Sequence, residues 1–281
     1  MSVVPRGNAA MGADWPDLVA EFDDWGEAGR VARLWWRDDD AVEPTPELAS
    51  LLRLAGDLPL TLAVIPADAR AELPEFLQAI APALPSPARW EGSERGQTMP
   101  RVAVMQHGWG HANHAAAGMK KSEFPAGRPA EAVARELTEG RARLAELFGP
   151  RALPVLVPPW NRFDAGFVPL LTKLGILGLS SMASRMAPPL PAGLVRMDVH
   201  VDLAAWKNER RFVGSGAALG GLIEHLRAYR LGPAEHAAPV GILTHHLIMD
   251  GATAGFVDRL IATVERHQAA AWASPAELLA R

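Results

Sequence analysis

Residues 32–40 are ARLWWRDDD, a short apolar run that leads at once into one arginine and three aspartates. A second run of this kind, RVAVMQ at residues 101–106, leads into the histidine-rich stretch HGWGHANH. Both runs have the length and apolar content of a buried strand. Because ionisable residues follow each run directly, the two stretches predict a parallel sheet that carries its chemistry at the carboxyl ends of its strands.

The rest of the chain repeats this alternation of strand and helix. Apolar runs of strand length occur at residues 32–36, 60–65, 101–106, 154–157, 176–180, 194–199 and 240–244. Apolar residues at three- and four-residue spacing indicate helices at residues 46–55, 73–83, 129–148, 164–174, 216–229 and 254–267. Repeated units of this kind are typical of α/β folds, and about seven parallel strands are enough for a barrel.

Length and composition indicate one large domain. The chain has 281 residues, of which 49% are hydrophobic and 21% are charged. This composition is that of a globular protein, and single α/β barrels of about 250 residues are common. We therefore predict one domain at residues 31–281, preceded by a helical N-terminal extension at residues 1–30.

Charge and composition exclude several classes of partner and site. The formal net charge is −4 and no run of Lys or Arg occurs, so nucleic acid is not an expected partner. The absence of cysteine excludes disulfides, thiolate nucleophiles and Cys-ligated zinc. Since no apolar stretch has the length of a membrane span or the form of a signal peptide, we expect a cytoplasmic protein. The sequence predicts no oligomeric state.

The three consecutive aspartates, Asp38, Asp39 and Asp40, are the first candidate for a site. Adjacent carboxylates repel one another, and burial of even one without a counter-charge is unfavourable by several kcal/mol. A bound cation would remove this penalty. The alternative interpretation is a solvated acidic turn that caps the following helix.

Two histidines supply the second candidate. His107 and His111 have the four-residue spacing of a helical zinc motif, but Gly108 and Gly110 disfavour a helix there, so we expect both imidazoles on a loop. Two histidines and one carboxylate form an open metal site that leaves positions for water and substrate. Zn²⁺ is the metal we expect, and Co²⁺, Ni²⁺ or Mn²⁺ suit the same donors.

Four motifs lie at the ends of the first, third, fourth and seventh predicted strands. They are RDDD at residues 37–40, HGWGH at 107–111, PPWN at 158–161 and LTHH at 243–246. This order resembles the polysaccharide deacetylase family, also called NodB-homology proteins or carbohydrate esterase family four, from about residue 34 to the C-terminus. The resemblance implies an α/β fold, a distorted (β/α) barrel of about seven parallel strands. It also implies a metal held by one Asp and two His, an Asp general base and a His general acid.

Carried over by position, the resemblance assigns the metal ligands and the base. Asp40, His107 and His111 match the three ligands, and Asp39 matches the base. Asp38 with Asp39 is the alternative register for the acidic pair. The general acid falls within the last motif.

In that last motif the acid is assigned to His245, and His246 is the other candidate. A carboxylate, Asp202 or Asp198, is expected to keep the acid protonated. The substrate groove is expected to contain Trp109, Pro159, Trp160, Asn161 and Arg162. Aromatic faces pack well on sugar rings, although both tryptophans also suit an ordinary wall or core. Supporting roles are expected for Arg37, Asp202 and His246.

The sequence departs from the family pattern at three positions. Ala41 replaces the usual glycine after the acidic pair, and Gly108 replaces the usual Ser or Thr after the first histidine. Val157 stands where the family has an arginine that orients the base, so Arg37 or Arg162 would have to substitute. These departures indicate a divergent member.

The implied function is metal-dependent hydrolysis of an acetyl group from an N- or O-acetylated sugar or polysaccharide. In this interpretation a metal-activated water attacks, an Asp accepts its proton and a His protonates the leaving group. One alternative is a metal-dependent amidohydrolase or esterase with a substrate other than carbohydrate. Another is a non-catalytic carbohydrate-binding relative that keeps the fold.

Overall fold

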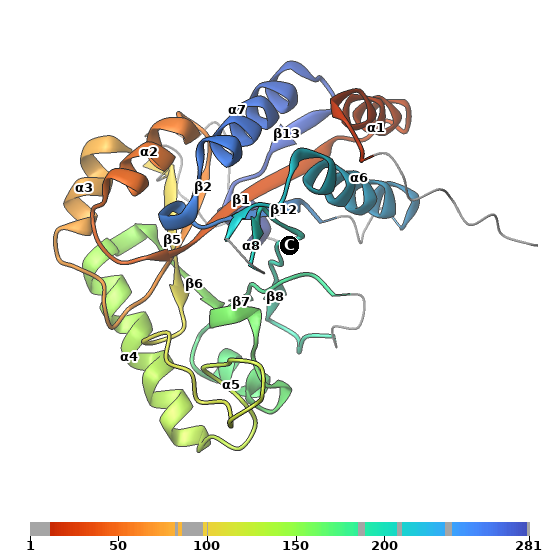
Figure 1. The fold of residues 1–281 in the computed structure, drawn as a ribbon. Coiled ribbons are helices and arrows are strands. Elements are labelled where there is room, and N and C mark those ends of the chain that lie inside the picture. The colour runs from red at the N-terminus through yellow and green to blue at the C-terminus, as the bar shows by residue number, and fades with distance from the viewer. Residues whose placement is uncertain are drawn as a thin grey trace, which may run out of the picture.

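The structure is a computed structural model that describes residues 12–81, 84–85, 98–99, 101–184, 189–206, 210–233 and 238–279 (Figure 1). One curled sheet dominates it. The strands of this sheet are β1 (Ala32–Ala41), β2 (Leu60–Val64), β5 (Val102–His107), β6 (Ala152–Val157), β7 (Gly178–Leu179), β8 (Val195–Arg196), β9 (Val201–Asp202), β12 (Val240–Thr244) and β13 (Ala270–Trp272). Two small antiparallel pairs lie outside it: β3 (Leu84–Pro85) with β4 (Thr98–Met99), and β10 (Ala204–Ala205) with β11 (Arg211–Phe212).

The sheet is parallel and curled. Its order is β8-β7-β6-β5-β2-β1-β12-β9, with β13 paired to the start of β1, and all of these described pairs are parallel. The two edge strands, β8 and β9, are joined by residues 197–200 alone, and a bridge between Met182 and Val199 lies beside this link. The predicted distorted α/β barrel is therefore confirmed, in the form of a curled half-barrel.

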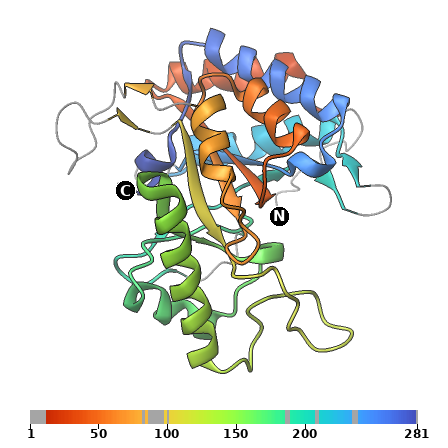
Figure 2. The ribbon, with the colours of Figure 1, turned by 90° about the vertical axis from the view of Figure 1, so that its left-hand side faces the viewer.

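Helices surround the sheet (Figures 1 and 2). They are α1 (Trp15–Glu27), α2 (Pro46–Ala55), α3 (Leu73–Ile80), α4 (Ala130–Phe148), α5 (Val168–Lys173), α6 (Ser215–Leu231), α7 (Gly251–Arg266) and α8 (Pro275–Leu279). Short 3-10 turns occur at η1 (Gly149–Arg151), η2 (Pro159–Asn161), η3 (Ala165–Phe167) and η5 (His246–Ile248). None of the helices in the described ranges combines the length and apolar composition that crossing a bilayer requires.

Strand β1 separates two apolar cores. Trp36 packs into the core between the sheet and its helices, with Leu48 and Leu51 of α2. Its neighbour Trp35 packs inside the barrel with Met105 and Val157. This division follows from the two-residue period of a strand, and it gives β1 two buried faces.

The predicted end of the first strand, at residue 36, is wrong, because β1 continues to Ala41. Arg37, Asp38 and Asp39 are all buried inside the strand, where each finds polar partners, so a drop in hydrophobicity does not mark the strand end. The pairing of β1 with β2 shifts register between Asp38 and Ala41, which is a β-bulge, and Asp40 has a positive φ of 71° there. The bulge re-aims the Asp40 side chain.

The other predicted elements agree in type and differ in extent. The predicted strands at 176–180 and 194–199 are reduced to the two-residue strands β7 and β8. The predicted helix at 73–83 ends at Ile80, and residues 82–83 lie outside the described residues. Helix α1 lies in the predicted N-terminal extension, of which residues 1–11 are also outside the described part. Its Leu18 and Phe22 belong to the same core as α2, and the domain boundary at residue 30 stays a prediction.

Candidate active site

Three side chains from distant parts of the chain converge at the carboxyl ends of β1 and β5. Oδ1 of Asp40 lies 3.2 Å from Nε2 of His107 and 3.5 Å from Nε2 of His111. The bulge of β1 presents Asp40, the last residue of β5 is His107, and His111 lies on the following loop. Within the described ranges, these three residues are the group of His and carboxylate side chains that could hold a metal ion, with one potential ligand atom from each lying within 4.8 Å of the others.

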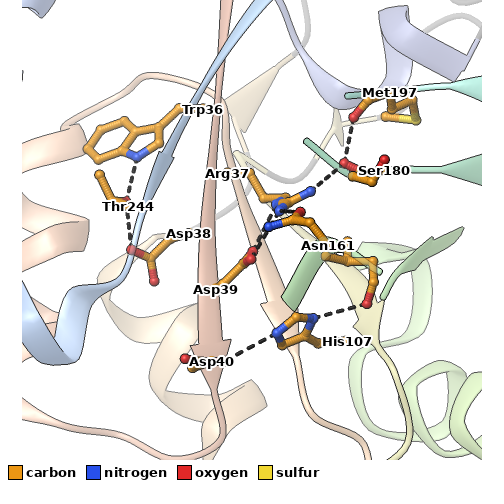
Figure 3. A network of polar contacts seen from close by, with 12 residues as sticks. Trp36, Arg37, Asp38, Asp39, Asp40, His107, Asn161, Ser180, Met197 and Thr244 are labelled. Atoms are coloured by element: carbon orange, nitrogen blue, oxygen red, sulfur yellow. Dashed lines mark hydrogen bonds and ion pairs between the residues drawn. The ribbon is translucent and has the colours of Figure 1, made fainter. Parts of the chain in front are cut away.

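His107 is held in the tautomer that a metal ligand needs. Its Nδ1 lies 3.0 Å from the carbonyl oxygen of Val157, and a carbonyl can only accept, so Nδ1–H donates. Nε2 is then the lone-pair nitrogen of the neutral ring, and it faces Asp40 (Figure 3). Burial alone would lower the pKa of His107, but the negative charges of Asp39 and Asp40 outweigh burial and raise it.

The pKa values of Asp40 and His111 are both lowered. Burial alone would raise the pKa of Asp40, but the hydrogen bond and charge of His107 outweigh burial and hold it below its usual range. Burial and the nearby charge of His107 lower the pKa of His111. Donors that share an ion at about 2.0–2.2 Å lie roughly 3.0–3.6 Å apart, so the two short separations fit a common divalent ion.

Arg37 and Asp39 form a buried ion pair just inside the barrel. Arg37 is 0% exposed and Asp39 2%. The guanidinium donates to Oδ2 of Asp39 at 3.0 Å, while its Nε lies 2.8 Å from Oδ1 without hydrogen-bond geometry. It also donates to Oδ1 of Asn161 at 2.8 Å and to Oγ of Ser180 at 2.7 Å (Figure 3). Arg37 thus lies where it can orient Asp39, the role of the family arginine whose position Val157 occupies here. Arg162 instead donates to the backbone carbonyl of Lys121.

Asp38 points to the opposite side of β1. Its Oδ1 lies 2.6 Å from Nδ1 of His246, and its Oδ2 accepts from the hydroxyl of Thr244 at 2.6 Å. Trp36 completes the group by donating its indole N–H to the same hydroxyl oxygen (Figure 3). Burial alone would lower the pKa of His246, but the charge and hydrogen bond of Asp38 outweigh burial and raise it. His246 is therefore bound to Asp38 and faces away from the site.

His245, at the end of β12, lies beside a second polar group. Its ring meets the half-exposed indole of Trp206 edge-on, with centroids 4.5 Å apart. Trp206 donates to Oδ2 of Asp202 at 2.6 Å, and Oδ1 of Asp202 accepts from the backbone of Ala204. The expected hydrogen bond between Asp202 and His245 is not among these contacts, although their charges interact. Nδ1 of His245 is buried and has no hydrogen-bond partner among the described residues.

A strained turn after β6 places the aromatic wall. Trp160 and Asn161 have positive φ angles of 56° and 55°, which non-glycine residues rarely adopt. The ring of Trp160 lies 4.3 Å from that of His111, centroid to centroid, and the Asn161 amide reaches Arg37. Because Asp40 and His111 also have positive φ, four of the five such residues in the described chain gather at this site. Strain of about 1–3 kcal/mol per residue that persists in one place is typical of a functional site.

Glu123 belongs to this site and was missed by the sequence analysis. Its carboxylate is 1% exposed and accepts hydrogen bonds from backbone N–H groups of the loop between His107 and His111. Burial raises its pKa, and those N–H donors oppose the increase. Glu123 lies in a stretch without periodicity before α4, so the sequence offers little signal for it.

A cavity of about 620 Å³ lies elsewhere, lined among others by Trp35, His200 and Tyr229. The backbone N–H of Gly241 donates to Nδ1 of His200, and burial together with His225 lowers the pKa of His200 to about 3. None of the proposed metal ligands lines this cavity. Asp198, the second expected partner for the acid, also lines it and binds Ser181 instead.

Comparison with known proteins was made at the levels of sequence and structure. No protein-family model matches the sequence, and no curated protein matches it either. A candidate polysaccharide deacetylase from Mycobacterium smegmatis superimposes with a TM-score of 0.61 and 16% identity, over 97% of this chain and 93% of the other. This chain has the polysaccharide deacetylase fold.

Two further structures with the deacetylase fold are similar. A family 4 acetyl xylan esterase from Clostridium thermocellum, solved with a cobalt ion, gives a TM-score of 0.51 and 11% identity, covering 88% and 89% of the two chains. A mutant of a family 4 carbohydrate esterase pseudoenzyme, with restored enzymatic activity, gives 0.52 and 14%, covering 90% of this chain and 68% of the other. Identities this low extend the likeness to the fold alone. The fold implied by the four motifs is confirmed.

Proposed function

We propose that this protein is a divalent-metal-dependent hydrolase that removes an acetyl group from an N- or O-acetylated sugar or polysaccharide. The observation that carries the proposal is the convergence of Asp40, His107 and His111 beside a buried Asp39. One carboxylate and two imidazoles are a donor set for an open metal site. The deacetylase fold supports the same reaction class.

Asp40, His107 and His111 would hold the ion. A divalent ion bound by these donors, Zn²⁺ in the first place and Co²⁺, Ni²⁺ or Mn²⁺ as alternatives, would polarise an acetyl carbonyl and lower the pKa of water. The carbonyl of Val157 fixes His107 so that Nε2 is available as a ligand. His111 has a lowered pKa and is therefore neutral, as a ligand must be.

Asp39 is the proposed general base. Its charge already acts on His107, so it lies next to the ligands. Among the described residues Oδ1 makes no hydrogen bond, although Nε of Arg37 lies 2.8 Å away, so this oxygen keeps acceptor capacity for a proton from water. Arg37 holds the carboxylate from below through Nε and Nη2, and Asn161 and Ser180 fix the guanidinium in turn.

His245 is the proposed general acid, because His246 is buried against Asp38 and unavailable to a substrate. The charge of His245 acts on both Asp40 and Asp202, which supports a position at the same rim. Proton donation by a positioned His assists departure of an amine or alcohol. Trp206 packs against the ring and restricts its orientation.

Trp160 and Trp109 are the proposed sugar-binding surface, together with Pro159, Asn161 and Arg162 at the same rim. Trp160 flanks His111, and the amphipathic ring of a tryptophan suits the apolar face of a sugar. Its left-handed backbone conformation holds the ring over the site. Lys121 lies with Nζ 5.9 Å from the centroid of this ring and extends the rim.

Metal analysis and acetate release test the proposal together. We expect the purified protein to bind about one equivalent of Zn²⁺ or Co²⁺, and His107→Ala and His111→Ala each to lose it. Metal-replete protein should release acetate from acetylated amino sugars or glycans. Stoichiometric metal in both variants would rule out the ligand assignment. Turnover of simple amides or esters alone would favour a non-carbohydrate hydrolase, and binding of glycans without any turnover would favour a non-catalytic relative.

A further inference from the structure

We propose that Glu123 is the positioning residue that holds the His111 loop in its ligand-binding shape, an inference that rests on the metal site proposed above. The carboxylate accepts hydrogen bonds from the backbone N–H groups of Trp109 at 3.1 Å, Gly110 at 2.8 Å and Ala112 at 3.4 Å. These three donors lie within residues 107–112, the stretch that contains both proposed histidine ligands. One buried side chain thus binds three backbone N–H groups of the loop.

Backbone N–H groups surround the buried Glu123 carboxylate. Among the described residues it forms no ion pair with Lys or Arg. Arg128 donates to the backbone carbonyl of Glu123, but its charge is paired with Glu136 at 2.6 Å. Successive backbone N–H groups that converge on an anion form a nest, and here the anion is supplied by the chain itself.

Position 108 requires glycine, both for its backbone conformation and for the space beside it. Its φ is +60°, a conformation that L side chains rarely adopt. A Cβ added there would overlap Oε2 of Glu123 and lie 2.7 Å from two ring carbons of Pro159. The Glu123 carboxylate therefore occupies the space into which a side chain at position 108 would extend.

This explains the departure of Gly108 from the Ser or Thr of the family pattern. In this chain a carboxylate 15 residues downstream of Gly108 fixes the loop and fills the space beside position 108. The second left-handed residue of the loop, His111 at φ 52°, then brings Nε2 to within 3.5 Å of Asp40. Glu123 touches neither the proposed metal nor the substrate, so it acts through His111.

The first test compares Glu123→Gln with the matched control Glu136→Gln. Glutamine keeps the shape but loses the charge, and it turns an N–H₂ group towards an N–H donor. We expect Glu123→Gln to weaken Co²⁺ binding about 10–100-fold, as loss of a partner that orients a ligand does, and to alter the Co²⁺ absorption spectrum. Glu136→Gln should stay within about 2-fold of the unsubstituted protein, since Glu136 does not contact the loop.

Amide hydrogen exchange supplies a readout without metal. In the metal-free Glu123→Gln protein, exchange at residues 109, 110 and 112 should accelerate at least several-fold relative to Glu136→Gln, because their acceptor is weakened. If the unsubstituted protein binds no Co²⁺, the proposed function is overturned and with it the ligand role of the loop. If it binds Co²⁺ and Glu123→Gln matches it in affinity and in exchange, the Glu123 inference alone is overturned.

A double-mutant cycle tests the link between the two residues. Gly108→Ala should weaken Co²⁺ binding in the unsubstituted protein, and it should do so several-fold less in a Glu123→Ala background, where the overlap with Oε2 is gone. The remaining contact with Pro159 sets the residual loss. Equal losses in both backgrounds would show that Gly108 and Glu123 act independently and would overturn the inference.

Discussion

Asp38 and Asp39 are adjacent in sequence and both buried, but their side chains lie in different surroundings on opposite faces of β1. Asp38 faces the helices, where both of its oxygens are hydrogen-bonded, to His246 and Thr244. Asp39 faces the inside of the barrel, where Arg37 pairs with it but Oδ1 makes no hydrogen bond within the described part of the chain. The two-residue period of β1 alone assigns these faces. A carboxylate with both oxygens hydrogen-bonded is suited to a structural role. A carboxylate that can still accept a proton beside a candidate metal site is suited to general-base catalysis.

Asp40 adds a third outcome to this comparison. A regular strand would direct it to the same face as Asp38, but the bulge and the positive φ turn it to His107 and His111. Three identical residues in a row therefore have three environments. The substitutions below separate them.

The largest effect is expected from Asp40→Asn. Asparagine tolerates the left-handed conformation, so the bulge should persist while the charged donor is lost. We expect Co²⁺ or Zn²⁺ affinity to fall by more than about 100-fold, beyond what loss of a supporting partner produces, and acetate release to fall below detection. Calorimetric metal titration measures the first and a coupled acetate assay the second. Unchanged affinity would assign the ligand to another residue.

Asp39→Asn should remove catalysis while metal binding remains. Loss of a general base lowers the rate by about 10²–10⁴-fold, and we expect that loss in kcat per folded molecule. The variant will also unfold more easily, because Arg37 is left as a buried cation; separation of a buried pair destabilises by roughly 3–5 kcal/mol. Assays well below the melting temperature, with metal content measured in parallel, separate the two effects. A kcat close to that of the unsubstituted protein would exclude Asp39 as the base.

Asp38→Asn is the matched case on the other face. It removes the anion that raises the pKa of His246 and breaks up a buried pair, so the free energy of unfolding should fall by about 3–5 kcal/mol, measured by urea titration. Metal affinity and kcat per folded molecule should stay within about 3-fold of their starting values, since Asp38 is not a donor to the site. A loss of kcat as large as that of Asp39→Asn would support the alternative register, in which Asp38 with Asp39 forms the acidic pair.

The sequence was sufficient for the fold and for the convergence of Asp40, His107 and His111, because strands of strong apolar character end next to them. It was insufficient for the division of roles among the aspartates. That division depends on where β1 ends, and buried Arg37, Asp38 and Asp39 resemble a loop in any hydropathy pattern. The two- and three-residue strands β9 and β13 were missed for a related reason, since such short segments have no period.

Long-range polar partners were also beyond the sequence. Glu123 meets its loop through backbone N–H groups, which carry no residue-type signal. His246 finds Asp38 only because β12 pairs with β1 in a parallel register that aligns Thr244 with Asp38. The first contact is decided by the path of the connection between β5 and α4 and the second by strand order, and periodicity reveals neither.

The smallest effect concerns the pH dependence of stability and distinguishes the outer face of β1 from the cavity near Trp35. The pKa of His246 is raised above its ordinary value of about 6.5, so the folded state binds this proton more tightly than the unfolded state. The resulting stabilisation is complete below about pH 6.5 and is lost as the pH rises through the raised value. His200, whose pKa is lowered to about 3, has the opposite sign: its contribution is present above about pH 6.5 and is lost as the pH falls towards 3.

Replacement of each histidine should therefore reduce the pH dependence of the unfolding free energy in a different pH range, the alkaline limb for His246 and the acidic limb for His200. His246→Gln should remove part of the decline in unfolding free energy as the pH rises above about 6.5, and His200→Gln should remove part of the decline as the pH falls below about 6.5. Urea titrations at a series of pH values measure both limbs in the metal-free protein. If His246→Gln flattened the acidic limb instead, His246 would be neutral in the folded state, and its contact with Asp38 would be a hydrogen bond between a neutral ring and a carboxylate. The negative charge of Asp38 would then have no cationic partner in His246. The contrast between a fully paired Asp38 and a partly paired Asp39 would no longer hold.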